Sequence, residues 1–287
     1  MATPQSIARV GVIGCGLMGS GIAEVCARSG SDVVVVESTD SAAAAGLDRL
    51  QRSLHRAQAK GRIDSAAEVL ERITIGADLQ SMSDRELVVE AVAEDEPLKT
   101  RIFSALDEIV ESPDAILASN TSSIPIMKLA VATQRPDSIL GVHFFNPVPV
   151  LSLVELVPSL MTSATVVERS KHFVEGQLGK HAIMSQDRAG FVVNALLIPF
   201  ILSAIRMFES GYATAEDIDE GLVRGCAHPQ GPLALADLIG LDTTKAVAES
   251  LYDEFKEPLY APPPLLARMV EAGLLGRKAG QGFYKYE

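Results

Sequence analysis

The segment VGVIGCGLMGSGIA, residues 10–23, constrains the fold of this chain more than any other stretch. It starts with a β-branched run that predicts a buried strand and continues into an apolar pattern that predicts a helix over 17–29. Between the two, Gly14, Gly16 and Gly19 have the spacing G-x-G-x-x-G. Strand, glycine turn and helix in this order are typical of the first half of a βαβ unit, from which parallel sheets are built.

Short β-branched runs and helical stretches alternate along the N-terminal half of the chain. The predicted strands are 9–13, 32–37, 87–92, 115–120 and 138–143. The predicted helices between them are 17–29, 41–60 and 97–111. Because these strands are apolar almost throughout, they are typical of a parallel sheet covered on both faces. After about residue 185 the pattern is helical. We therefore predict an α/β fold, with an N-terminal Rossmann-like doubly wound sheet in residues 1–187 followed by an all-α C-terminal domain in residues 188–287.

The charge of the chain argues against one large class of partners. It has 37 acidic and 25 basic residues and a formal net charge of −12, whereas nucleic-acid binding needs a concentrated basic surface. Its three cysteines, Cys15, Cys26 and Cys226, form no CxxC pair and have no metal-type spacing with histidine. We expect no nucleic-acid partner, no metal site and no disulfide framework, and we expect a reducing, cytoplasmic location.

One apolar stretch, FVVNALLIPFILSAIRM at 191–207, is nearly long enough to cross a membrane. Asn194, Pro199 and Arg206 interrupt it, so we predict a buried helix and no membrane partner. Together with the rest of the helical domain, it offers more apolar surface than a lone domain of this size needs. We therefore expect a homodimer that forms through the C-terminal domain.

The glycine turn predicts a site for a dinucleotide. Gly14 would make the tight turn, Gly16 would let a pyrophosphate approach the backbone, and Gly19 would let the helix pack closely on the sheet. The helix begins at Leu17 and Met18, and the backbone N–H groups of a helix start attract phosphate. A glycine triplet alone is a weak signal, but here it follows a strand and opens a helix, which is the context that the motif requires.

An acid ends the second predicted strand. Glu37 lies 23 positions after Gly14, where a carboxylate can accept hydrogen bonds from the ribose hydroxyls of adenosine. A carboxylate in that place also repels a 2′-phosphate, and no arginine follows in the segment ESTD. The sequence therefore predicts NAD as the cofactor in preference to NADP.

Polar side chains follow two later strands of the predicted sheet. LASNTSS provides Asn120 and Ser122, and GVHFFNP provides His143 and Asn146. Ligands of such sheets bind outside the carboxyl ends of the strands, so we expect these residues to reach the nicotinamide end of the cofactor. Oxidation of an alcohol needs a group that takes the hydroxyl proton, and an imidazole suits that task near neutral pH. His143 is the candidate.

The following segment, LSLVELV, alternates like a strand and contains a single charged residue, Glu155. A carboxylate in so apolar a segment needs a partner. His143, twelve positions earlier, is the obvious one, because the carboxylate would also fix the orientation of the imidazole. Taken alone, His143 is equally explained as a satisfied core histidine. A nucleotide site together with a matched carboxylate favours a catalytic His–Glu pair, with Ser122 as a hydrogen-bond donor to the reacting oxygen.

Taken together, the motifs are specific. GCGLMGSGIA, ASNTSS, VHFFNPVPV, LVELV, DRAGFVVNALL, GPLALADLIGLDTT and GRKAGQGFYKY occur in this order over nearly the whole chain. The chain resembles the L-3-hydroxyacyl-CoA dehydrogenases, and among them the single-function bacterial 3-hydroxybutyryl-CoA dehydrogenases. The resemblance implies NAD-dependent interconversion of an L-3-hydroxyacyl-CoA and a 3-ketoacyl-CoA by hydride transfer, with an acyl-CoA as substrate.

The resemblance also implies a role for individual residues. It places the catalytic base on His143, its carboxylate partner on Glu155, substrate-oxygen contacts on Ser122 and Asn194, cofactor contacts on Glu94, Lys99 and Asn120, and CoA contacts on Ser53 and Lys60. Asn194 is alternatively a buried asparagine that caps a neighbouring backbone. Ser53 and Lys60 are alternatively part of a solvated helix face, and their helix has fewer lysines than in many relatives.

Two other functions are compatible with parts of this pattern. A dehydrogenase of free hydroxy acids, of the gulonate type, would need no CoA site. A non-catalytic NAD-binding protein, structural or redox-sensing, would have no use for both His143 and Glu155. Activity on the free acid would favour the first alternative, and the pair of side chains argues against the second.

Overall fold

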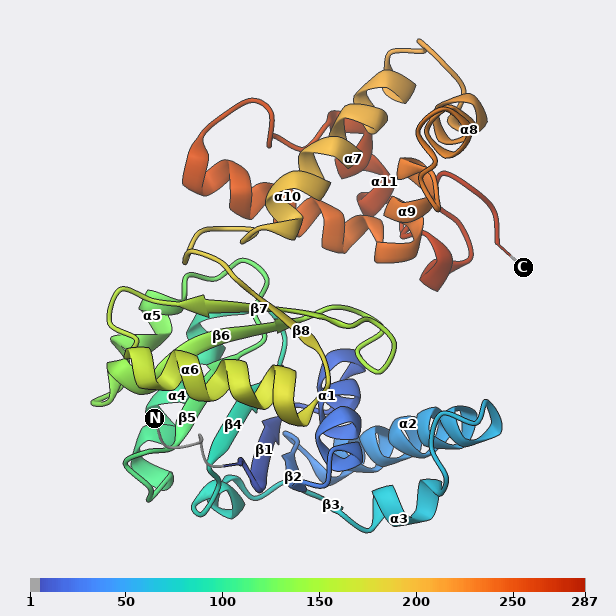
Figure 1. The fold of residues 1–287 in the computed structure, drawn as a ribbon. Helices are drawn as coiled ribbons and strands as arrows, with labels where there is room; N and C mark the ends of the chain where they lie inside the picture. The colour runs from blue at the N-terminus through green and yellow to red at the C-terminus, as the bar shows by residue number, and fades with distance from the viewer. Residues whose placement is uncertain (1–5, 287) are drawn as a thin grey trace. The chain divides into compact units, whose positions relative to one another are not determined.

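The computed structural model describes residues 6–286, which form two compact units. We call Met1–Asp187 the sheet unit and Arg188–Glu287 the helical unit. The first contains an eight-stranded sheet with helices, and the described part of the second contains helices, turns and isolated β-bridges near its end (Figure 1). This confirms the predicted fold class of a Rossmann-like sheet followed by an all-α domain.

The strands of the sheet unit lie in the order β3-β2-β1-β4-β5-β6-β7-β8. Their bounds are β1 Arg9–Ile13, β2 Asp32–Val36, β3 Ile73–Gly76, β4 Leu87–Glu90, β5 Ile116–Ser119, β6 Ile139–Phe144, β7 Leu153–Pro158 and β8 His181–Met184. All neighbouring pairs are parallel except β6 and β7, which run antiparallel. The carboxyl ends of β1, β4, β5 and β6 therefore meet at one edge of the sheet, where ligands of such folds bind.

Several helices of the sheet unit begin at a residue whose side chain caps them. The bounds of the helices in this unit are α1 Leu17–Arg28, α2 Asp40–Ala59, α3 Ala66–Leu70, α4 Glu96–Ile109, α5 Ile126–Ala130 and α6 Ala164–His172, with the short 3₁₀ turns Leu79–Met82 and Pro136–Ser138 and a π-helical turn Phe173–Gln177 after α6. Thr39 caps α2 by accepting from the Ala42 N–H, and Asp95 caps α4 by accepting from the Leu98 N–H. A short polar side chain before a helix satisfies N–H groups that lack a partner within it.

The two faces of the sheet have different roles. One face packs with α1, α2, α3 and α6 in a single apolar core, to which alternate strand residues such as Val142 belong. The intervening strand residues, among them Glu90 and His143, point to the opposite face. On that face the sheet approaches α5 closely, since a Cβ added to Gly141 would lie 2.9 Å from Ile126. Buried polar side chains are thus collected on the face that α5 covers.

The predicted elements of the sheet lie close to those observed, with two differences. β2 ends at Val36, so Glu37 follows the strand instead of closing it. β3 and β8 were not predicted, because each has only four residues and both lie at the edges of the sheet. Their side chains are half-buried or exposed, so neither segment has the continuous apolar pattern of the central strands.

The helical unit forms its own apolar core. Its helices are α7 Val193–Glu209, α8 Ala215–Cys226, α9 Pro232–Ile239, α10 Leu241–Phe255 and α11 Pro264–Glu271, followed by the 3₁₀ turn Arg277–Ala279. Residues Ile198, Ile201, Leu202 and Ile205 of α7 are buried in that core. Nowhere in residues 6–286 does a helix combine the length and apolarity that a membrane crossing requires.

Two buried acids show the structural role of the C-terminal motifs, for which the sequence indicated no role. Asp219 accepts hydrogen bonds from the first N–H groups of α9 and from the Tyr284 hydroxyl. Asp237 accepts from the backbone N–H groups of residues 283 and 284 and from the Tyr286 hydroxyl. A Cβ added to Gly282 would lie 1.9 Å from Asp237 Oδ1. The motifs GPLALAD and GQGFYKY therefore join the C-terminal segment to α8 and α9 of the helical unit.

Candidate active site

The glycine turn between β1 and α1 has the geometry expected for each glycine. Gly14 has a φ of +89°, a conformation that L side chains rarely adopt. A Cβ on Gly19 would lie 1.9 Å from the Gly14 carbonyl oxygen, so only glycine allows α1 to start so close to the turn. Gly16 differs, because a Cβ there would meet no protein atom within 4 Å. No side-chain or backbone contact within residues 6–286 requires glycine at that position, which fits a ligand that approaches the backbone.

The start of α1 is suited to an anion. Gly16 is the N-cap residue and makes no side-chain hydrogen bond, and the first turn contains no acidic residue. Leu17 is 62% exposed at this end, while Met18 packs against the core. Free N–H groups and the positive end of the helix dipole favour phosphate here. The residues present therefore fit the pyrophosphate of a dinucleotide.

Glu37 is held against the glycine turn. Its carboxylate accepts hydrogen bonds from the backbone N–H groups of Cys15 and Ser38. The Arg49 guanidinium of α2 donates to the Cys15 carbonyl oxygen at 2.6 Å. The acid that is expected to contact the adenosine ribose thus lies beside the expected pyrophosphate site and also fixes the turn.

A buried charge network lies at the carboxyl ends of β4 and β5. Glu90 is fully buried, and its carboxylate is 2.6 Å from the Lys99 ammonium and 2.6 Å from the Ser119 hydroxyl. Lys99 is itself only 1% exposed, and its ammonium also lies 3.3 Å from Glu94. The predicted cofactor residue Lys99 is therefore engaged within the protein, where its ammonium pairs with two carboxylates.

Glu94 organises the segment that contains Ser122. Its carboxylate accepts from the Thr121 hydroxyl, from the backbone N–H of Ser122 at 3.0 Å, and from the N–H and hydroxyl of Ser123. The Ser122 hydroxyl lies 3.5 Å from the same oxygen. Burial raises the pKa of the Glu94 carboxyl, but the Lys99 ammonium and the hydrogen bonds from residues 121–123 outweigh it and lower that pKa. Glu94 is thus held as a carboxylate.

Asn120 connects these loops to the next strand. Its backbone N–H donates to the Glu90 carbonyl oxygen, and its side-chain oxygen accepts from the Phe144 N–H at 2.9 Å. On the other side of β4, the Ala91 N–H donates to the Ile13 carbonyl oxygen, just before the glycine turn. A continuous series of hydrogen bonds therefore runs from the glycine turn, through the loops after β4 and β5, to the end of β6.

His143 and Glu155 occupy facing positions on β6 and β7. They are register partners in the antiparallel pair, and His143 Nδ1 lies 2.7 Å from Glu155 Oε2. Glu155 is fully buried and His143 is 6% exposed. The Phe145 ring meets the imidazole edge to face, with 4.6 Å between centroids. The residues between the histidine and the acid are thus the end of β6, the connecting loop and the start of β7.

The remaining predicted residues of the sheet unit lie outside this cluster. Asn146 is exposed in the loop after β6. Ser53 and Lys60 lie two turns apart on α2, the former half-buried and the latter exposed as its C-cap. Asn194 is half-buried in the first turn of α7, within the helical unit. Their contacts with substrate or cofactor stay predictions.

The sequence did not reveal the residues that anchor the site. Glu90 and Ser119 are examples, and Thr121 and Ser123 hold Glu94 in the same way. One signal was available, because Glu90 is the single acid inside the apolar run LVVEAV, just as Glu155 is in LVELV. The resemblance assigned its partner Lys99 to the cofactor, so the ion pair between Lys99 and Glu90 was not expected.

The chain is similar to known proteins over nearly its whole length. Residues 9–188 match the family model of the 3-hydroxyacyl-CoA dehydrogenase, NAD binding domain, and residues 190–286 match that of the C-terminal domain. A 3-hydroxybutyryl-CoA dehydrogenase from Mycobacterium tuberculosis is 56% identical over 284 residues, covering 98% of this chain and 99% of that protein.

Solved structures agree with this similarity. The crystal structure of FadB2 from M. tuberculosis has a TM-score of 0.97 at 55% identity and covers 99% of this chain and 100% of its own. An (S)-3-hydroxybutyryl-CoA dehydrogenase from Ralstonia eutropha has a TM-score of 0.92 at 46% identity, covering 98% of this chain and 100% of its own. The chain therefore belongs to the 3-hydroxyacyl-CoA dehydrogenase family, as its motifs predicted. It is an oxidoreductase whose cofactor is NAD.

Proposed function

We propose that the enzyme interconverts an L-3-hydroxyacyl-CoA and the corresponding 3-ketoacyl-CoA, with 3-hydroxybutyryl-CoA and acetoacetyl-CoA as the favoured pair. The observation that supports this reaction most is the buried His143–Glu155 pair at 2.7 Å. His143 lies on β6, the strand next to β5, and Ser122 follows the end of β5. The names of relatives that match end to end support the acyl-CoA substrate and the short chain.

In this proposal His143 moves the proton of the 3-hydroxyl group. Because Glu155 binds Nδ1, we assign proton transfer to Nε2, which acts as base in oxidation and as acid in reduction. The Glu155 carboxylate holds the ring in one orientation and stabilises the imidazolium that forms during oxidation. Bound NAD supplies the hydride acceptor for C3, and NADH supplies the donor for the reverse reaction.

Ser122 and Asn194 would hold the reacting oxygen of the substrate. Glu94 accepts from the Ser122 backbone N–H and thereby fixes the position of the hydroxyl that donates to that oxygen. The cofactor would be held by the glycine turn, by Glu37 at the ribose, and by Glu94, Asn120 and Asn146 near its reactive end. Lys99 would serve the cofactor through Glu94, 3.3 Å away. On α2, Ser53 and Lys60 would contact CoA.

A substrate panel tests this function. Initial rates of oxidation would be measured with L-3-hydroxyacyl-CoA esters of four to sixteen carbons, with free 3-hydroxybutyrate, and with gulonate. We expect the highest kcat/KM with the four-carbon ester and no significant rate with either free acid. Comparable efficiency with a free acid would contradict the acyl-CoA assignment, and no turnover of any compound would contradict a catalytic role.

We also propose that two copies of the chain associate through the helical unit. Several large apolar side chains of this unit are exposed, namely Leu196, Met207, Tyr212, Leu238, Tyr252 and Leu259. Exposed apolar surface on this scale marks an interaction site more often than free surface.

The three cysteines are free thiols, two of them buried, which supports a cytoplasmic location.

A further inference from the structure

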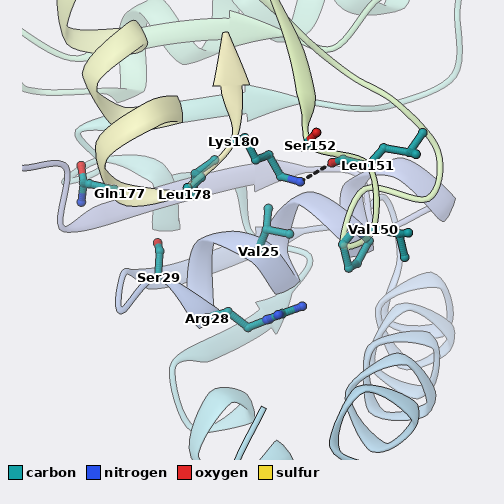
Figure 2. Close-up of a pocket in the computed structure, with 11 residues that line it drawn as sticks. Val25, Arg28, Ser29, Val150, Leu151, Ser152, Gln177, Leu178 and Lys180 are labelled. Carbon is teal, nitrogen blue, oxygen red and sulfur yellow. Dashed lines mark hydrogen bonds between the residues drawn. The ribbon is translucent and has the colours of Figure 1, made fainter. Parts of the chain in front are cut away.

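Lys180 joins two parts of the sheet unit that lie far apart in the sequence. It precedes β8, and its ammonium donates to the Val148 carbonyl oxygen at 2.7 Å and to the Leu151 carbonyl oxygen at 2.6 Å. Figure 2 shows the second of these bonds, with the lysine side chain reaching toward the loop. The next residue, His181, donates its N–H to the Ser152 carbonyl oxygen at 2.7 Å. Three carbonyl groups of one loop are thus bound from the start of β8.

That loop, residues 145–152, connects the strand of His143 to the strand of Glu155. It is longer than the two-residue turns that set the register of a hairpin by themselves. Near its centre, Val148 is buried against α1, where a Cβ on Gly21 would lie 2.8 Å from it. The residues beyond it are held less by packing, since Val150 is 54% and Leu151 42% exposed.

The lysine is suited to this task by its charge. An ammonium group has three donors, and hydrogen bonds from a charged donor are stronger than neutral ones. Within residues 6–286, Lys180 forms no ion pair with a carboxylate that could draw it away from the carbonyl groups. Burial, and after it the Arg28 guanidinium, lower the pKa of Lys180 by more than Cys26 raises it, so the net shift of this pKa is downward. The carbonyl oxygens are therefore the groups that stabilise its charge.

We propose that Lys180 is a positioning residue for the catalytic pair. By binding the carbonyl groups of Val148 and Leu151, it holds the loop whose end leads into β7. It thereby sets the position of the Glu155 carboxylate relative to the His143 ring. This inference rests on the proposed function, because it requires the pair to be catalytic.

The first test is Lys180→Met, which keeps the length of the side chain and removes its charge and donors. We expect kcat for acetoacetyl-CoA reduction to fall roughly 10- to 100-fold, the scale of a displacement of about 1 Å at a reacting group. The KM for NADH should stay within about twofold, because Lys180 binds the loop at Val148 and Leu151, whereas the proposed cofactor contact of this loop, Asn146, lies at its start. Lys171→Met is the matched control, since Lys171 is exposed on α6 of the same unit, and it should keep the parental kcat.

Rescue separates positioning from a general packing role. Lys180 and Arg28 line a pocket of about 310 Å³ beside the loop (Figure 2), which leaves room for a larger cation. Lys180→Arg should therefore recover most of the kcat lost in Lys180→Met, because a guanidinium can also donate to two carbonyl groups. If Lys180→Met does not fold, as judged by its thermal melt, Lys180→Gln takes its place with the same measurements.

A double mutant decides whether Lys180 acts through Glu155. In a Glu155→Gln background, Lys180→Met should reduce kcat by much less than in the parent, since coupled residues are not additive. An equal loss in both backgrounds, or a parental kcat in Lys180→Met itself, would overturn the positioning role and leave the proposed function standing. A parental kcat in Glu155→Gln alone would instead reject the catalytic pair, and the positioning role with it.

Discussion

His143 and Glu155 are direct cross-strand partners, and their side chains meet on the face of the sheet that α5 covers. Partners in an antiparallel pair have their Cβ atoms about 4.5–5.5 Å apart, so the backbone alone brings the two groups within hydrogen-bond reach. The carboxylate is fully buried. Such a carboxylate needs an imidazole or another donor to stay charged, and this mutual need suggests how to test the pair.

Glu155→Gln should keep the fold and the affinity for NADH but lose turnover. Losing one proton-transfer partner costs roughly 10²–10⁴-fold in rate, and His143→Ala should be at least as damaging. Because the two act as a unit, the double mutant should be little worse than the worse single mutant. The measurement is kcat for acetoacetyl-CoA reduction across pH in all four proteins. Single effects that multiply in the double mutant would show that His143 works alone and that Glu155 is structural.

NADH should be preferred over NADPH because Glu37 repels a 2′-phosphate. Glu37→Ala should bring the kcat/KM for NADH closer to that for NADPH, but it also removes the acceptor of the Cys15 N–H. Glu37→Gln is the sharper variant, since it keeps a side-chain oxygen for that bond and removes the charge. Both variants should bring the two kcat/KM values closer together, and Glu37→Gln should do so with less loss of stability. Equal efficiency with the two cofactors in the parent would refute this explanation.

Glu94 should contribute to stability in a pH-dependent way. Its pKa is lowered from an ordinary value of 4.5 in the folded protein, so its contribution is complete above that value and is lost as the pH falls through the lower folded pKa. The difference in free energy of unfolding between the parent and Glu94→Gln should therefore be largest at neutral pH and shrink in acid. Urea denaturation at several pH values measures it. A difference that does not change with pH would mean that the charge of Glu94 makes no net contribution to the free energy of unfolding.

Asp237 should be a main determinant of the stability of the helical unit. It is 1% exposed and accepts three hydrogen bonds from residues 283, 284 and 286. Asp237→Ala leaves three half-buried donors without their acceptor and should cost roughly 1–3 kcal/mol. Asp253→Ala is the control, because Asp253 forms an exposed ion pair with Lys256, and it should change stability by less than about 0.5 kcal/mol. Equal effects of the two variants in urea denaturation would count against this explanation.

The proposed dimer predicts the mass of two chains by light scattering at micromolar concentration. Leu196→Asp places a charge on an apolar residue of α7 that is 72% exposed and should shift the mass toward one chain on dilution. Leu160→Asp, at a 95% exposed leucine of the sheet unit, should not. A parent that has the mass of one chain would refute the assembly, and a dimer that survives Leu196→Asp would move the interface to another face of the helical unit.

Features determined by nearby residues could be predicted from the sequence. The glycine turn is one of them, because strand, turn and helix adjoin within residues 9–28. The pairing of His143 with Glu155 was also predictable, since a lone acid in an apolar strand requires a partner. The ion pairs of Lys99 could not be predicted, because the resemblance assigns this lysine to the cofactor, and its burial beside Glu90 and Glu94 is a property of the folded chain.

Lys180 shows a second limit of the sequence. Its partners are backbone carbonyl groups, and every residue has such a group, so no pattern of side chains points to the contact. Asp237 is similar, because two of its three donors are backbone N–H groups near the end of the chain. Interactions between a side chain and a distant backbone become visible only once the tertiary structure is known.

The antiparallel pairing of β6 with β7 also limits how enzymes with this site can change during evolution or design. Inserting one residue within β7 would turn Glu155 to the opposite face of the sheet, because side chains alternate with a period of two. Inserting residues into the loop 145–152 would leave that alternation intact. Variation in length, and with it new contacts near the reactive end of the cofactor, should therefore accumulate in the loop, whereas the two strands tolerate substitutions but no insertions or deletions.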